Sequence, residues 1–287
     1  MKRITGLLLG TCVLAGGLGI AAAQEPTPPP KVLYVQREFI KPGKGGAPHE
    51  KSESAFVQAM TRAKWPTHYL AVNSLSGKSR ALFLTGYDSF AAWEKDFMAE
   101  QSNPTLSAAV DRAAVADGDL LSEFDASALF YREDQSLRSA VDIAHMRYFE
   151  ISLYRVRPGH LQDWDTLVKM VIAAYQKIPD AHWATYQAMY GQEGSTYVVF
   201  NPMKSAAEID QSFDQSKKFV EAMGDDMKKF TELETATIES SQHNLFVFSP
   251  KMSYVSDEWI KADPDFWKPK ASAAAAPKKM EEKPAAQ

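Results

Sequence analysis

Polar and apolar residues alternate along residues 147–156 (RYFEISLYRV), the clearest short-period segment of the chain. The two sets of alternate positions differ in character: Phe149, Ile151 and Leu153 on one side, Glu150, Ser152 and Tyr154 on the other. Successive side chains of a β-strand point to opposite faces, so this pattern predicts a strand that is buried on one face. We expect the apolar set to pack under helices.

Beyond this strand the apolar spacing changes to three and four residues. The positions concerned are Leu161, Trp164, Leu167, Val168, Val171, Ile172 and Tyr175. This spacing places apolar side chains on one face of an α-helix. Residues 185–190 and 196–200 then predict two strands joined around Gly191 and Gly194, which is a hairpin signal.

Two helical runs and a strand complete this half of the chain. Residues 205–208 (SAAE) match a capping box, which predicts a helix whose inner face carries Ile209 and Phe213. A further helical run covers residues 217–239. It leads to a last strand at residues 244–248.

The same order of elements occurs earlier in the chain. Strands are predicted at residues 32–40, 67–73, 80–85 and 126–132, and helices at 49–63, 89–99 and 105–116. Matching residues lie 116 positions apart at several anchors: Pro42 and Pro158, Gly43 and Gly159, Phe97 and Phe213. The order β-α-β-β-α-β, with an extra helix before the last strand, is typical of a ferredoxin-like unit. We therefore predict two repeats, residues 32–133 and 146–249, joined by a linker at 134–145.

Two features of these repeats carry a resemblance to a known family. Each repeat opens with a strand, a Pro-Gly turn and a helix, at residues 39–43 and 154–159, and aromatic hairpins follow Trp65 and Trp183. The pattern resembles the dimeric α+β barrel superfamily, which includes antibiotic-biosynthesis-type monooxygenases, stress-responsive barrel proteins and the NIPSNAP-like group. The resemblance covers residues 32–249. It implies an α+β fold in which two ferredoxin-like βαββαβ repeats form, within one chain, the barrel that a dimer usually forms.

The two ends of the chain have a different character. Residues 1–23 combine Lys2 and Arg3 with an apolar stretch and three alanines, the pattern of a secretory signal that is cleaved after Ala23. We expect an extracytoplasmic protein, periplasmic or secreted, with no stable membrane span after cleavage. The other end segments are a Pro-rich leader at residues 24–31, a C-terminal extension at 250–270 and a disordered tail at 271–287.

Composition narrows the possible chemistry. The one cysteine, Cys12, lies within the predicted signal, so the mature protein would have no disulfide, thiolate nucleophile or cysteine metal ligand. The formal net charge is −4, and no basic stripe offsets it. Nucleic acid is not an expected partner, because phosphate binding depends on clustered lysine and arginine side chains.

The strand patterns also predict where a binding site would lie. If the apolar faces pack under the helices, the opposite faces line the space between the two sheets. The candidate pocket then comprises Tyr34, Glu38, His68, Glu150, Tyr154 and His243 from strands, with Trp65 and Trp183 from the aromatic hairpins. Such a space suits a small apolar or aromatic molecule, and burial there would raise the pKa of the two glutamates.

The six histidines are dispersed and none belongs to an HExxH motif, so we expect no metal site. His49 and His160 follow the Pro-Gly turns at helix starts, where we expect them to be solvated. The resemblance adds a further expectation, since haem-handling members of the superfamily bind iron through a helix histidine. The helices around Trp93 and Ile209 carry no histidine, so no cofactor is expected.

Three functions are open at this point. The first is an exported protein that binds a small apolar or aromatic ligand in its barrel. The second is a cofactor-independent monooxygenase-like or isomerase-like enzyme, in which an acid–base pair such as His68 and Glu150 moves a proton. The third is a non-catalytic interaction scaffold, with residues 254–267 as a segment that binds a partner or packs back on the barrel. Neither the ligand nor the oligomeric state follows from the sequence.

Overall fold

The computed structural model describes residues 26–268, so the predicted signal peptide and tail lie outside the described residues. Eight antiparallel strands close into a barrel in the order β1-β3-β2-β8-β5-β7-β6-β4. The strands are β1 (Val32–Ile40), β2 (Tyr69–Ser74), β3 (Arg80–Tyr87), β4 (Leu121–Leu137), β5 (Tyr148–Val156), β6 (Trp183–Tyr190), β7 (Ser195–Met203) and β8 (Ile238–Phe248). The α-helices are α1 (Ala47–Ala63), α2 (Phe90–Gln101), α3 (Pro104–Gly118), α4 (Leu161–Tyr175), α5 (Ala207–Met223), α6 (Met227–Thr237), α7 (Asp257–Ala262) and α8 (Pro264–Trp267).

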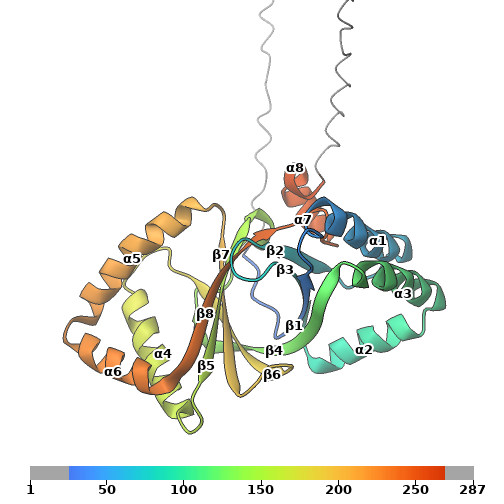
Figure 1. The fold of residues 1–287 in the computed structure, drawn as a ribbon. Helices are drawn as coiled ribbons and strands as arrows, with labels where there is room; N and C mark the ends of the chain where they lie inside the picture. Colours follow the sequence, from blue (N-terminus) through green and yellow to red (C-terminus); the bar gives the residue numbers. More distant parts are fainter. Residues whose placement is uncertain (1–25, 269–287) are drawn as a thin grey trace, which may run out of the picture.

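Two groups of helices flank the barrel on opposite sides (Figure 1). Helices α1, α2 and α3 lie on one side and α4, α5 and α6 on the other, while the short helices α7 and α8 lie near one end. The two halves of the chain are joined twice, because β4 pairs with β6 and β2 pairs with β8. Within residues 26–268, no helix has the length and apolar character needed to cross a bilayer. The predicted α+β class and the barrel are confirmed.

The barrel interior is filled by apolar side chains from all eight strands. Phe149 and Ile151 lie in this core and Leu153 packs against it, so the prediction that this set lies under helices is wrong. On the opposite face of β5, the ring of Tyr154 packs on Trp164 of α4, with ring centroids 5.6 Å apart. Alternation separates the two faces of a strand but does not say what covers each. A small barrel that closes on itself needs the more apolar face inside, where side chains alone fill the space.

The predicted element boundaries are correct where the periodicity is longest. β1 and α4 begin and end at the predicted residues. β4 begins at Leu121 instead of residue 126 and continues to Leu137, into the predicted linker. β8 begins at Ile238 instead of residue 244. The added first residues pair within their own half, β4 with β1 and β8 with β5, and the last residue of β4, Leu137, pairs with Trp183 of the other half.

The predicted capping box is also wrong. Helix α5 begins at Ala207 without a side-chain cap. The Glu208 carboxylate instead accepts a hydrogen bond from the backbone amide of Lys204, at 2.8 Å. In a capping box the Glu208 carboxylate would accept from the backbone amide of Ser205. Here it accepts from the amide of Lys204, one residue earlier.

Both end segments pack on the barrel. The carbonyl oxygen of Pro30, in the leader, accepts a hydrogen bond from the hydroxyl of Tyr186, a residue of the barrel core (3.0 Å). At the other end, Trp267 is 4% exposed and donates its indole N–H to the carbonyl oxygen of Ala144 (2.9 Å). The prediction that the aromatic extension packs back on the barrel is confirmed.

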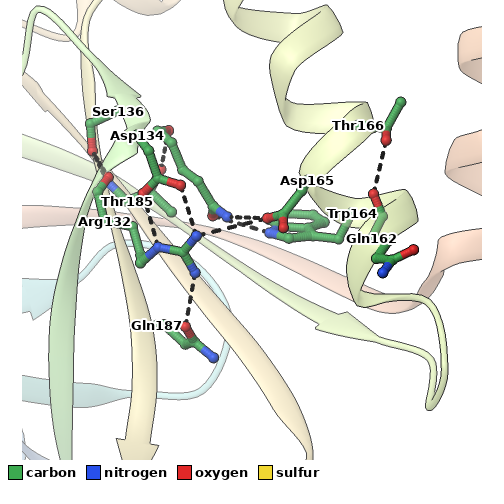
Figure 2. A network of polar contacts seen from close by, with 10 residues as sticks. Arg132, Asp134, Ser136, Gln162, Trp164, Asp165, Thr166, Thr185 and Gln187 are labelled. Carbon is green, nitrogen blue, oxygen red and sulfur yellow. Dashed lines mark hydrogen bonds and ion pairs between the residues drawn. The ribbon is translucent and has the colours of Figure 1, made fainter.

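A polar network holds α4 against the barrel (Figure 2). The guanidinium of Arg132, on β4, donates to the side chain of Gln187 (3.0 Å) and lies 3.8 Å from the carboxylate of Asp165. The side-chain amide of Gln135 donates to Asp165 (2.9 Å) and accepts from the indole of Trp164 (3.1 Å). Since Trp164 and Asp165 belong to α4, these contacts tie the helix to β4.

Candidate functional site

An apolar cavity of about 500 Å³ opens at the end of the barrel where the leader and the C-terminal extension meet. We call it the mouth pocket. Its inner wall includes Leu33, Leu70, Leu84, Phe149, Ala184 and Phe200. Its rim includes residues 28–30 of the leader, His68, Trp183 and Trp259. Both halves of the barrel and both end segments therefore contribute to one cavity.

His68 is a titratable group in the wall of this pocket. Its ring stacks on the ring of Tyr254, with centroids 4.7 Å apart. Burial lowers the pKa of His68, although a hydrogen bond with the backbone of Pro66 and the charge of Asp257 oppose the change. The neutral imidazole, which can accept a proton, is therefore favoured at neutral pH.

Three of the predicted site residues lie at or beside the mouth pocket. His68 and Trp183 line it. Trp65 is one contact away, because its carbonyl oxygen accepts a hydrogen bond (2.8 Å) from the hydroxyl of Tyr254, on which His68 stacks.

The other predicted site residues lie on the outer face of the barrel: Tyr34, Glu38, Glu150 and Tyr154 under the helices, and His243 exposed on β8. Glu150 and Tyr154 line a second cavity, of about 390 Å³, beneath α4, α5 and α6. The ring of His243 contacts the ring of Tyr154, with centroids 5.6 Å apart. His68 and Glu150 line different cavities, so the structure does not bring them together as an acid–base pair.

Four ionisable side chains form a buried cluster between the barrel and the helices α1 and α3. Glu38 comes from the end of β1, His49 and Glu53 from successive turns of α1, and Asp117 from the last turn of α3. One possible ligand atom from each lies within 4.8 Å of the others. The exposed fraction is 8% for Glu38 and 2% for each of the other three. We call this group the carboxylate–histidine cluster.

The Nε2 atom of His49 lies among the three carboxylates. It is 2.9 Å from Oε2 of Glu38, 3.7 Å from Oδ1 of Asp117 and 3.9 Å from Oε1 of Glu53. The last two oxygens are buried, and no hydrogen-bond donor from outside the cluster reaches them. Throughout the described part of the chain, no lysine or arginine forms an ion pair with these carboxylates. The cluster therefore concentrates negative charge with one imidazole to balance it.

When no cation is bound, the carboxylate–histidine cluster reduces its negative charge by protonation of a carboxylate. Burial raises the pKa of Glu53 to about 10, and the charges of Glu38 and Asp117 and a hydrogen bond with Asp117 add to the rise. Burial also raises the pKa of Glu38, although its hydrogen bond with His49 opposes this. At neutral pH the cation-free cluster therefore holds a proton on Glu53. The protonated carboxyl group can donate a hydrogen bond to Asp117.

The expectation that His49 is solvated is wrong, because the turn after β1 folds α1 over the face of the barrel on which Glu38 lies. The sequence carried one signal of the cluster. His49 and Glu53 are four residues apart in a helix and so share a face, in an HExxE pattern that the HExxH motif does not cover. Glu38 and Asp117 belong to other elements, and no spacing along the chain connects them to this pair. Dispersed histidines along the chain therefore do not exclude a metal site.

No protein-family model matches the sequence, and no curated protein is similar to it. Solved structures that share the chain arrangement include an anthrone oxidase-like protein, with 15% identity and a TM-score of 0.48 over 79% of this chain and 94% of that one. Another is the chlorite dismutase from Candidatus Nitrospira defluvii in complex with imidazole, with 10% identity and a TM-score of 0.44 over 81% and 96% of the two chains.

A third is a Lactobacillus acidophilus NCFM protein whose assignment as a monooxygenase is provisional, with 8% identity and a TM-score of 0.47 over 78% and 94% of the two chains. At these identities and TM-scores, the likenesses leave the chemistry of this chain to be argued from its own residues. The closed barrel with flanking helices is nevertheless the architecture that the resemblance to the dimeric α+β barrel superfamily implied.

Proposed function

We propose that this protein is an exported binding protein whose mouth pocket holds a small, flat, mainly apolar molecule. The observation that carries the proposal is the cavity itself. Its volume of about 500 Å³ lies within the range of small-molecule sites, and apolar and aromatic side chains dominate its walls. Export rests on the signal-like pattern of residues 1–23.

The proposal includes the origin of the barrel as two ferredoxin-like repeats. The strand order β4-β1-β3-β2 in the first half matches the order β8-β5-β7-β6 in the second, and this supports a duplication. Under this proposal the pocket has a part from each repeat. Leu33, Leu70 and Leu84 come from the first, and Phe149 and Phe200 from the second.

The polar groups of the pocket limit the class of ligand. Most of the pocket wall is apolar. The few polar side chains include His68 and Ser256, which lie at the rim with Trp259. Aromatic rings favour stacked or edge-on contact with another flat ring system. A molecule with an apolar ring body and one polar end fits this arrangement best.

The fluorescence of Trp183 and Trp259 offers a direct test. We expect 2-naphthol to quench tryptophan emission in a saturable manner. Substitution Ala184→Phe adds a ring to the inner wall, and we expect it to weaken binding by at least about tenfold, or roughly 1.4 kcal/mol.

Ala207→Phe is the matched control, because Ala207 lies at the exposed start of α5 and outside the pocket. Binding by this variant should equal that of the unmodified protein. Equal binding by both variants, or no saturable quenching by 2-naphthol and a panel of similar aromatic molecules, would reject the mouth pocket as a ligand site.

A second candidate function is catalysis of the monooxygenase or isomerase type without a bound cofactor. The neutral imidazole of His68 in the pocket wall favours it, since a positioned base can take a proton from a bound ring compound. If the protein turns over such a compound, His68→Gln should lower kcat by roughly 10²–10⁴-fold while ligand binding changes little. Unchanged kcat would remove His68 from any catalytic role. The scaffold alternative has less support, because Trp267 is used in the protein's own core.

A further inference from the structure

The carboxylate–histidine cluster has the donor atoms of a metal site. Three carboxylates and one imidazole each offer a ligand atom, and all of these atoms lie within 4.8 Å of one another. First-row divalent metals bind such oxygen and nitrogen ligands at roughly 2.0–2.2 Å, which places neighbouring ligand atoms about 3.0–3.5 Å apart. The three distances from His49 Nε2 run from 2.9 to 3.9 Å. Small side-chain movements would therefore be enough to surround an ion.

Two oxygens point into the cluster, and no hydrogen-bond donor from outside the cluster reaches them. They are Oε1 of Glu53 and Oδ1 of Asp117, and both residues are only 2% exposed. Burying a carboxylate without a partner costs several kcal/mol, because the lost hydration is not replaced. A divalent cation would supply the missing positive charge and would contact both oxygens.

The second half of the barrel shows that the fold does not need charged residues at this position. β5 pairs with β7 and β8 as β1 pairs with β3 and β4. Under α4 and α6, the layer between sheet and helices contains an apolar cluster that includes Trp164, Leu167, Tyr197 and Phe230, beside the second cavity. Among the described residues, no charged side chain of the second half is buried. The first half instead buries four ionisable groups in the corresponding layer, which points to a binding role.

We propose that Glu38, His49, Glu53 and Asp117 bind one divalent transition-metal ion of the Mn²⁺, Fe²⁺ or Zn²⁺ class. Carboxylates alone would also suit Mg²⁺ or Ca²⁺, but an imidazole ligand favours the transition metals. The bound ion would link β1, α1 and α3, the three elements that carry its ligands. This inference is independent of the mouth pocket.

The test uses purified protein that has been treated with a chelator and dialysed. Titration with Mn²⁺, followed by the loss of the free-ion electron paramagnetic resonance signal, should give one bound ion per chain. A large excess of Ca²⁺ should not displace it. We expect Asp117→Asn and His49→Gln each to weaken Mn²⁺ binding by at least about tenfold.

Asp111→Asn is the matched control, because Asp111 is an exposed carboxylate on the same helix. This variant should bind Mn²⁺ as tightly as the unmodified protein. Thermal unfolding provides a second readout that does not depend on whether the variants fold well: Mn²⁺ should raise the Tm of the unmodified protein. Undiminished binding by folded Asp117→Asn, or neither stoichiometric binding nor a Tm increase in the unmodified protein, would overturn the proposal.

Discussion

Substitution of Trp267 by alanine is expected to lower the free energy of unfolding by about 3–5 kcal/mol, the usual cost of removing a buried aromatic side chain. Trp267 is 4% exposed and belongs to the barrel core, where its ring packs near Phe248 and Trp259. The substitution would leave a cavity at the end of the barrel and would remove the shorter of the two hydrogen bonds to the carbonyl oxygen of Ala144, leaving the one from Arg147 (3.3 Å). Urea unfolding should show a lower midpoint with an unchanged slope.

Phe213→Ala is the control for this experiment, since Phe213 is also aromatic but 64% exposed on α5. Its effect should stay within about 0.5 kcal/mol, as for most surface substitutions. If Trp267→Ala proves as stable as Phe213→Ala, the C-terminal extension does not pack on the barrel in solution, and the described rim of the mouth pocket is wrong.

The second large effect is expected from Glu53→Gln in protein kept free of metal by a chelator. The folded-state pKa of Glu53 is about 10, well above the value of 4.5 for an exposed glutamate. The fold therefore favours the protonated form. The stability that this group contributes is complete below about pH 4.5 and is lost as the pH rises towards about 10. Glutamine resembles the protonated side chain but cannot ionise, so the variant should lack this loss and should be more stable than the unmodified protein at pH 8–9.

Unfolding midpoints measured from pH 5 to pH 9 would check this expectation. Glu94→Gln is the control, because Glu94 is exposed on α2 and should leave the pH dependence unchanged. If Glu53→Gln loses stability with rising pH as steeply as the unmodified protein, the buried carboxyl of Glu53 does not hold its proton as described.

Much of the fold could be predicted from the pattern of apolar residues. The alternation in β5 and the helical spacing in α4 are long and regular, and both elements were predicted almost to the residue. The face of β5 that carries Phe149 was assigned to the wrong layer, because alternation is symmetric and only the tertiary structure decides which face is enclosed. The extra length of β4 and β8 also depends on their strand partners: β4 begins beside β1 and β8 begins beside β5, and Leu137 at the end of β4 pairs with Trp183 of the other half.

The candidate sites could be predicted only in part. The prediction that His68 and Trp183 line a cavity is correct, but this cavity lies at the barrel end and the leader forms part of it. The sequence also predicts Glu38 and Glu150 inside the barrel. Both lie on its outer face instead, Glu38 beside His49 and Glu150 in the second cavity. Glu38 and Asp117 are 79 residues apart in the chain, and only the packing of α1 and α3 on the barrel brings them together.

The carboxylate–histidine cluster is the feature that most distinguishes this chain from a generic barrel, since it replaces packed apolar side chains with buried charge. Diffraction from crystals grown with Mn²⁺, with anomalous differences recorded above and below the manganese absorption edge, would locate the ion. We expect one strong peak about 2.2 Å from ligand atoms of Glu38, His49, Glu53 and Asp117. A map with no peak among these four residues, or with peaks only at exposed carboxylates, would contradict the account.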